Sequence, residues 1–444
     1  MGFFKNLFSG SGPTEEAPNI QFGRFSDSYK EEVKYDEWDK ALELFQQHNY
    51  VAAYESFFSY LSEDTVGNVQ CTKKGAKISF SFYQGSKLIT GTADGQKFYA
   101  EAKIARLKSS DIGVYRKLLE DNFQLRYSRY AIDDNKNLTI VFGTYALDAS
   151  PYKLYYALKE LATTADKTDD ILVDRYQSLE SINTHHIREI SLEEKTVKYE
   201  YLQTAIKEAQ EVTENCDLNL AKHPGALSYI YLDLIYRIDY LLKPEGYTMD
   251  CIAKIDKLYF HENTRSLTAK NEAMGKQIRK LQKLTQNNFY QELYEVKATF
   301  GTTTPSGQKR IAEFIKGEIG NMDWYLSNGY HAYALAIPSY IVGYSLYSYS
   351  MPIPMRSLLA LVYRVCEYPF FRKLGFHDKF VKPDSSLSSS NIKRAIMDIV
   401  AENKSQYDNL NPDMKAISYD SIYHFVKSFL LMVSDLDFTR KDLR

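Results

Sequence analysis

Apolar and polar residues alternate with a period of two along residues 76–104. Phe80 and Phe82 alternate with polar neighbours, and the run from Phe98 to Ile104 alternates in the same way after two turns. Such a pattern predicts strands with one face on a core and the other in water, joined as an antiparallel meander. We therefore predict three consecutive strands here, with these four apolar side chains buried on one side.

Helical and strand patterns on both sides of this meander complete one predicted domain. The further elements are a helix within 36–62, a helix capped by Ser109 or Ser110 with Val114, Leu118 and Leu119 facing inward, strands at 125–132 and 138–145, and a helix opened by Ser150 and Pro151. The predicted order is α-β-β-β-α-β-β-α around an antiparallel sheet. This is an α+β domain.

Two sequence segments in this region are typical of a known family. They are GQKFYAEAKIARL, beginning at Gly95, and YRKLLEDNFQLRYSRYAIDDNKNLTIVFGTYALDASPYKLYYALKELA, beginning at Tyr115. Through them, residues 36–166 resemble the type III secretion chaperone-like, YbjN-like superfamily. The resemblance implies a domain that binds extended segments of other polypeptides along sheet and helix grooves, commonly as a homodimer, and that catalyses no reaction.

The strand pattern stops at residue 167, and amphipathic helical periodicity takes its place. We predict a large all-α region after the α+β domain, with one long helix at 264–298. The predicted parts of the chain are a short amphipathic tip and flexible linker at 1–35, the chaperone-like domain at 36–166, a first helical part at 167–300 and a second helical part at 301–444.

Composition and charge are those of an ordinary globular protein. The chain has 444 residues, 44% of them hydrophobic and 25% charged, with a net charge of −2. This balance gives no whole-chain reason to expect a nucleic-acid partner. The four cysteines, Cys71, Cys216, Cys251 and Cys366, show no paired spacing, which predicts reduced thiols and a cytoplasmic protein.

The first residues form a short apolar pattern without the features of a secretory signal. Phe3, Phe4, Leu7 and Phe8 fall on one side of a helix, and no apolar run of signal length follows. We expect this tip to dock on a protein or to touch a membrane surface. Residues 9–30 are rich in Ser, Gly, Pro and Glu, which is typical of a linker.

A segment at 329–355 contains no Lys, Arg, Asp or Glu. Its length raises the question of a membrane span, but Pro338 and a row of tyrosines make it only mildly apolar. We predict a kinked, buried core helix and no transmembrane span. The alternative is a Tyr-lined binding surface made by Tyr333, Tyr340, Tyr344 and Tyr347.

The predicted long helix also carries a basic stripe. Lys276, Lys280 and Lys283 lie on one face of it. A solvated helix face explains this stripe, and phosphate or acidic-partner binding is the other interpretation.

The spacings of the candidate residues match no known motif for catalysis, cofactor binding or metal binding. The glycine-rich run at 301–310 has the wrong spacing for a phosphate-binding loop and follows a helix. His185 and His186 are adjacent, and the loose set Cys216, His223, Cys251 and His261 matches no zinc pattern. We predict no catalytic residue, no cofactor and no metal.

The sequence thus favours a non-enzymatic protein that binds a polypeptide through its α+β domain. The candidate partner-binding residues are Tyr83, Tyr99 and Tyr130 on the sheet, and Phe3, Phe4 and Phe8 in the tip. Two alternatives stay open: an enzyme or small-molecule-binding protein with a site in the Tyr-rich C-terminal third, and a nucleic-acid or membrane-surface adaptor that uses the basic helix at 264–283 and the Phe-rich tip.

Overall fold

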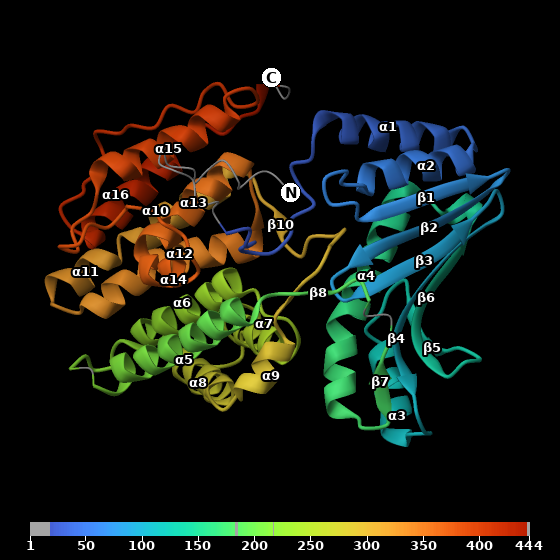
Figure 1. Cartoon of the computed structure of the whole chain (residues 1–444), viewed down its shortest axis with the longest axis horizontal. Coiled ribbons are helices and arrows are strands. Elements are labelled where there is room, and N and C mark those ends of the chain that lie inside the picture. The colour runs from blue at the N-terminus through green and yellow to red at the C-terminus, as the bar shows by residue number, and fades with distance from the viewer. Residues whose placement is uncertain (1–17, 183–184, 216, 442–444) are drawn as a thin grey trace. The chain divides into compact units, whose positions relative to one another are not determined.

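A computed structural model describes residues 18–182, 185–215 and 217–441, and the chain separates into two compact units (Figure 1). One, here called the α+β unit, comprises Phe25–Glu189 and Tyr294–Thr302. The other, here called the helical unit, comprises the described residues of Met1–Arg24, Ile190–Leu293 and Thr303–Arg444. Neither unit is continuous in sequence, because the α+β unit consists of two pieces and the helical unit of three.

The α+β unit is built around a seven-stranded sheet with four helices. Its elements are α1 (Glu32–Gln46), α2 (Tyr50–Leu61), β1 (Val69–Lys74), β2 (Lys77–Gln84), β3 (Lys87–Ala93), β4 (Lys97–Leu107), α3 (Ile112–Asn122), β5 (Arg129–Ile132), β6 (Asn137–Tyr145), the 3₁₀ turn η1 (Ala146–Asp148), α4 (Pro151–Arg175), β7 (Leu179–Ser181), β8 (Arg188–Glu189) and β9 (Tyr294–Glu295). The strand order is β1-β2-β3-β4-β6-β5, with β7 also paired to β4, and β8 pairs with β9 as a separate ribbon. All these pairings are antiparallel.

The predicted meander is confirmed. Strands β2, β3 and β4 pair antiparallel in sequence order, and Phe80, Phe82, Phe98 and Ile104 are all buried. The structure adds β1 before them, so four strands precede α3 where we predict three. The sequence of β1, VQCTKK, lacks the alternation because β1 is an edge strand, exposed along nearly its whole length.

The core of the α+β unit lies between one face of the sheet and helices α2 and α4 (Figure 1). Ser150 caps α4 by accepting a hydrogen bond from the Lys153 N–H, and Pro151 occupies the first turn, as its sequence predicts. Two details of α3 are wrong in the prediction. Its N-cap is Asp111, because that carboxylate reaches the free N–H groups, and Leu119 points to solvent.

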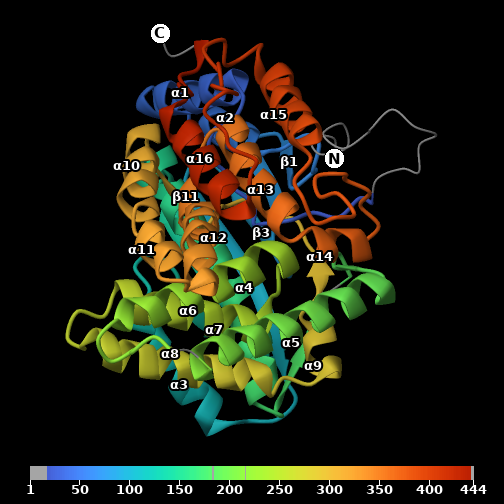
Figure 2. The same ribbon diagram turned by 90° about the vertical axis from the view of Figure 1, so that its left-hand side faces the viewer.

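The helical unit contains twelve helices and one two-stranded pairing in its described residues. They are α5 (Leu192–Glu214), α6 (Pro224–Leu242), α7 (Gly246–Phe260), α8 (Leu267–Gln282), α9 (Gln286–Gln291), β10 (Thr304–Pro305), α10 (Gln308–Ile319), α11 (Met322–Ser327), α12 (His331–Ser348), β11 (Tyr349–Ser350), α13 (Ile353–Cys366), α14 (Tyr368–Lys373), α15 (Ser389–Asn403) and α16 (Ile422–Asp435). Helix α6 packs against α5, α7, α8 and α12, and Figure 2 shows it among them.

The predicted long helix at 264–298 is wrong. Helix α8 ends at Gln282, and Thr285 caps the start of α9 by accepting a hydrogen bond from the Asn288 N–H. A threonine that caps a new helix competes with continuation of the old one. Among the described residues, no helix combines the length and the apolar character needed to cross a membrane.

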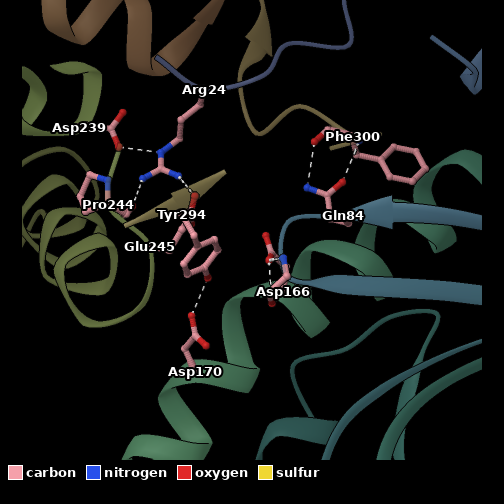
Figure 3. Close-up of polar contacts among 10 residues, drawn as sticks. Arg24, Gln84, Asp166, Asp170, Asp239, Pro244, Glu245, Tyr294 and Phe300 are labelled. Atoms are coloured by element: carbon pink, nitrogen blue, oxygen red, sulfur yellow. Dashed lines mark hydrogen bonds and ion pairs between the residues drawn. The ribbon is translucent and has the colours of Figure 1, made fainter. Parts of the chain in front are cut away.

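The end of the predicted linker is packed. Phe22 lies against Phe371 and Phe376 in the core of the helical unit, with ring centroids 5.0 and 5.8 Å away. Arg24 donates to the Asp239 carboxylate at 2.7 Å and to the Pro244 carbonyl at 2.6 Å (Figure 3). The linker prediction is therefore wrong for this stretch. Residues 1–17, which include the predicted tip, lie outside the described residues.

Candidate functional site

Helix α3 carries apolar side chains on two sides. Val114 and Leu118 are buried in the core of the α+β unit. Ile112, Leu119 and Phe123 are exposed by 83%, 66% and 89% of their surfaces. Their spacing of seven and four residues places these three on one side of the helix. We call them the α3 face.

The start of α3 is held firmly in place. The Asp111 carboxylate accepts hydrogen bonds from the Gly113 N–H at 2.8 Å and the Val114 N–H at 3.3 Å. Its other oxygen accepts from the Ser178 hydroxyl at 2.6 Å. The Ser178 hydrogen bond and the two backbone donors lower the pKa of Asp111, so the carboxylate that caps the helix stays ionised.

The loop from α3 to β5 is also anchored. Glu160 on α4 accepts hydrogen bonds from three consecutive N–H groups, those of Arg126, Tyr127 and Ser128. Burial acts to raise the pKa of Glu160, but these donors outweigh it and lower the pKa. The Asn122 side chain accepts from the Tyr130 N–H at 2.7 Å, next to the outer strand of the sheet. The α3 face is thus presented on an ordered support.

The three predicted sheet tyrosines do not form one surface. Tyr99 is 41% exposed, and its hydroxyl donates to Glu101 at 3.1 Å. Tyr83 is half-buried, with the Lys297 ammonium 5.4 Å from its ring centre. Tyr130 is only 8% exposed and pairs with Ile140 on the core face of the sheet, so its prediction as an outward residue is wrong. Strand β5 has only four residues, so its alternation of polar and apolar positions is too short to show which side chains face the core.

A second candidate site is already occupied by part of the same unit, the 294–302 segment. The Gln84 side chain makes three hydrogen bonds to the backbone of this segment. The amide oxygen accepts from the N–H groups of Thr299 and Phe300, and the amide nitrogen donates to the Phe300 carbonyl at 3.2 Å. Figure 3 shows the two hydrogen bonds with Phe300. The Thr299 hydroxyl donates to the Tyr83 carbonyl at 2.8 Å. Most of this recognition is directed at the main chain.

One side chain anchors the segment. Phe300 is almost fully buried, and its ring meets those of Phe82 and Tyr155 edge to face, at centroid distances of 5.7 and 5.4 Å. Upstream, the Lys297 carbonyl accepts a hydrogen bond from the Gly85 N–H at 2.9 Å. The segment therefore combines backbone pairing with a single aromatic anchor, which is how extended peptides are commonly recognised.

A buried ion pair lies beside the β2–β3 turn. The Lys87 ammonium is 2.6 Å from the Asp169 carboxylate, and the Ser86 hydroxyl donates to the same oxygen at 2.7 Å. Burial raises the pKa of Asp169 to about 6, against the opposing effect of Lys87. Lys87 is fully buried, and its charge is neutralised inside the α+β unit by Asp169.

Helix α4, which carries Asp169, also contacts the beginning of the 294–302 segment. The Tyr294 hydroxyl donates to Asp170 at 2.9 Å, and burial raises the pKa of Asp170 (Figure 3). One turn earlier, the Asp166 carboxylate accepts from the Ser86 N–H at 2.8 Å. These acids fix α4 to the segment and to the β2–β3 turn, so their perturbed pKa values have a structural explanation.

The Tyr-rich face of α12 lies in the core of the helical unit. Tyr333 and Tyr340 are buried, while Tyr344 and Tyr347 are half-buried. The ring of Tyr340 packs against Phe314 at 5.8 Å. The structure thus places this face mainly among other aromatic rings, as the predicted core helix requires, and gives a Tyr-lined binding surface little support.

A charged network is also buried in the helical unit. Arg237 donates to Glu367 at 2.8 Å and lies 3.2 Å from Asp233. Burial raises the pKa of Asp233 to about 6, and Arg237 acts in the opposite direction. The carboxylates are satisfied by this arginine and by Ser339, which indicates a structural role.

The basic stripe lies on and just after α8. Lys280 donates to the Gln277 side chain at 3.1 Å, whereas Lys276 and Lys283 form no ion pair with any described residue. Gln277 also lines an open hollow of about 510 Å³, together with Lys254 of α7. Lys254 is paired with Asp250, and both Lys257 and Glu262 also line the hollow, so its lining carries charges of both signs.

Three features of the described residues bear on metal or nucleophilic chemistry. No cluster of three or more His, Cys, Asp or Glu side chains that could hold a metal occurs among them. Burial raises the pKa of Cys366 well above its usual value, which keeps the thiol protonated. The Ser421 hydroxyl lies 2.9 Å from a ring nitrogen of His424, but Ser421 is the N-cap of α16.

Several residues of these sites were not found from the sequence. The outward side of α3 was missed because Leu119 was assigned to the core, although Ile112, Leu119 and Phe123 repeat at helical spacing. Gln84 and Phe300 were missed because they are 216 residues apart, and no local pattern connects them.

No protein-family model matches this chain, and a comparison with curated proteins also finds no match.

Proposed function

We propose that this protein binds another polypeptide through the α+β unit and performs no catalysis. The observation that carries the proposal is the α3 face. Three large apolar side chains on one side of a short, well-anchored helix are left in water, although the opposite side of that helix is buried normally.

The energetics favour a partner on this surface. Isolated exposed apolar residues are ordinary, but a row of them on one helix is typical of an interaction site. Removing each such side chain from water contributes about 1.5–3 kcal/mol. The anchored caps reduce the entropy that binding would otherwise cost. The resemblance of residues 36–166 to chaperone-like domains is consistent with this class of partner.

The test replaces the α3 face with polar residues. The full-length variant Ile112→Ser, Leu119→Ser, Phe123→Ser should fold as the unchanged protein does, because all three side chains are exposed. We expect a partner recovered with the unchanged protein from its native host to bind this variant at least about 100-fold more weakly, which corresponds to about 2.7 kcal/mol. Calorimetry with the purified partner measures the loss.

A matched control makes the same kind of change on the helical unit. Leu192 and Met397 are exposed apolar residues there, and Leu192→Ser with Met397→Ser should leave partner affinity unchanged. If the α3 variant still binds normally, or if the control loses binding equally, the α3 face is not the partner site.

A further inference from the structure

The 294–302 segment is bound in the manner of a ligand. Its residues 297–301 contact the rest of the α+β unit through backbone hydrogen bonds with Gln84 and Gly85, one aromatic anchor and a threonine hydroxyl. Residues 294 and 295 are held separately, by the pairing of β9 with β8 and by Asp170. Two of these features, backbone pairing and a pocket for one side chain, are what a receptor for extended peptides supplies.

The structure also defines which sequence fits. The Thr299 hydroxyl both donates to the Tyr83 carbonyl and accepts from the Asn68 side chain at 3.1 Å, so a hydroxyl is needed at this position. The next residue must be aromatic to fill the space between Phe82 and Tyr155. A charged or short side chain at that position would leave the pocket unfilled.

Glycine is required after the aromatic residue. A Cβ at Gly301 would lie 2.8 Å from a carboxylate oxygen of Asp27 and 2.9 Å from its backbone nitrogen. Asp27 cannot easily move, because its other oxygen accepts a hydrogen bond from the Tyr155 hydroxyl at 2.6 Å.

Upstream, the Lys297 ammonium lies over the Tyr83 ring and donates to the Gly67 carbonyl at 3.3 Å.

From this geometry we propose that the α+β unit has a receptor groove for an extended segment of the form Lys-x-Thr-Phe-Gly, occupied by residues 297–301 of the same chain. The external ligand is a segment of a partner protein with the same chemistry. It replaces the built-in segment by taking over the Gln84 hydrogen bonds and the aromatic pocket. This inference deepens the proposed function, because it adds the specificity of a second surface on the same unit.

The experiment empties the groove and refills it. The full-length variant Phe300→Ala removes the anchor, and a fluorescent peptide with the sequence LYEVKATFGTT, residues 293–303, is added in solution. We expect the variant to bind this peptide at least 100-fold more tightly than the unchanged protein does, because the tethered segment competes at an effective concentration in the millimolar range. Fluorescence anisotropy measures both affinities.

Two control peptides test the predicted specificity. A peptide with alanine in place of the phenylalanine should bind Phe300→Ala at least 10-fold more weakly than the parent peptide. A peptide with alanine in place of the following glycine should also be weakened, by its contact with Asp27. Equal binding of all three peptides would overturn the inference, since it would show attraction without a defined groove.

A milder variant covers the case in which Phe300→Ala does not fold. Thr299→Ala keeps the anchor but removes the hydroxyl contacts, so the parent peptide should compete more effectively than it does with the unchanged protein. If folded variants of either kind do not bind the peptide, the segment is simply part of the core. That result leaves the α3 proposal intact, because the serine variants of the α3 face test a separate surface.

Discussion

The two units of this chain treat their large apolar side chains differently. The helical unit buries the tyrosines of α12 among other rings, and Leu192, Tyr247, Trp324 and Met397 are its described large apolar residues that stay exposed. The α+β unit exposes many more. Besides the α3 face, they are Val33, Tyr35, Tyr99, Tyr127, Ile132, Tyr145, Leu147, Tyr152 and Tyr156. Both units nevertheless bury an aspartate beside a cation.

The difference concerns the apolar side chains that lie outside each core. Few of the described large apolar side chains of the helical unit are exposed. The α+β unit has a complete core, yet it keeps apolar side chains outside that core. Stability within the unit does not require those residues, which is consistent with the proposed binding of a polypeptide.

The two tryptophans allow each unit to be followed separately. The chain has only Trp38, in the α+β unit, and Trp324, in the helical unit. The variants Trp38→Phe and Trp324→Phe each leave one fluorescent reporter. Each serves as the reference for the substitutions below.

The largest expected effect separates a buried tyrosine from an exposed one. Tyr340→Ala should destabilise the helical unit by about 3–5 kcal/mol, because Tyr340 is 4% exposed and its loss leaves a cavity. Tyr156→Ala in the α+β unit, where the ring is 57% exposed, should change stability by less than about 0.5 kcal/mol. Urea denaturation followed at the tryptophan of the same unit measures both. Similar losses at the two positions would remove the contrast between the units.

A smaller effect concerns the dependence of stability on pH, which should be similar in the two units. The pKa of Asp169 and that of Asp233 are both raised to about 6, while an unfolded aspartate titrates near 4. Between these values the folded state keeps a proton that the unfolded state has lost. Each group therefore makes its unit less stable as pH rises from about 4 to about 6, by on the order of 2 kcal/mol.

The variants Asp169→Asn and Asp233→Asn isolate these contributions. Each should flatten the fall in stability over this pH range at the tryptophan of its own unit. The slope is compared, and not the absolute stability, because Asp169→Asn also leaves Lys87 without its partner. An unchanged slope would show that the carboxylate is already ionised at pH 4.

The smallest effect comes from matched helix caps. Ser150 caps α4 in the α+β unit, and Ser191 caps α5 in the helical unit by accepting from the Glu194 N–H at 3.1 Å. Each change to alanine should cost about 1 kcal/mol. We expect Ser150→Ala to shift the Trp38 transition and Ser191→Ala the Trp324 transition. A shift of both transitions by either change would show that the two units unfold together.

Local patterns predicted much of the fold and less of the sites. The alternation around Phe80 and Phe98 identified strands because one face of each strand is buried, and Ser150-Pro151 identified the start of a helix. The edge strand β1 has no buried face to impose such a pattern. No local pattern predicts the buried pair of Lys87 and Asp169, because the two residues are far apart in sequence.

The sites depend on contacts between distant parts of the chain. The groove for the 294–302 segment requires Gln84 and Phe300 to meet, and nothing in either local sequence encodes the other. The α3 face could have been found, since its three residues repeat at helical spacing. Both faces of that helix are apolar, however, and periodicity alone cannot assign one of them to the core.

The discontinuity of the units has a consequence during protein synthesis. Residues 25–189 leave the ribosome before the 294–302 segment has been made, and the interval is on the order of ten seconds at ordinary elongation rates. During that time the Gln84 amide and the Phe82 ring lack their final neighbours. For Phe22 the order is reversed, because it is synthesised long before Phe371 and Phe376, against which it packs in the folded chain. A nascent chain that stalls before residue 294 would therefore display an empty groove to other proteins around the ribosome.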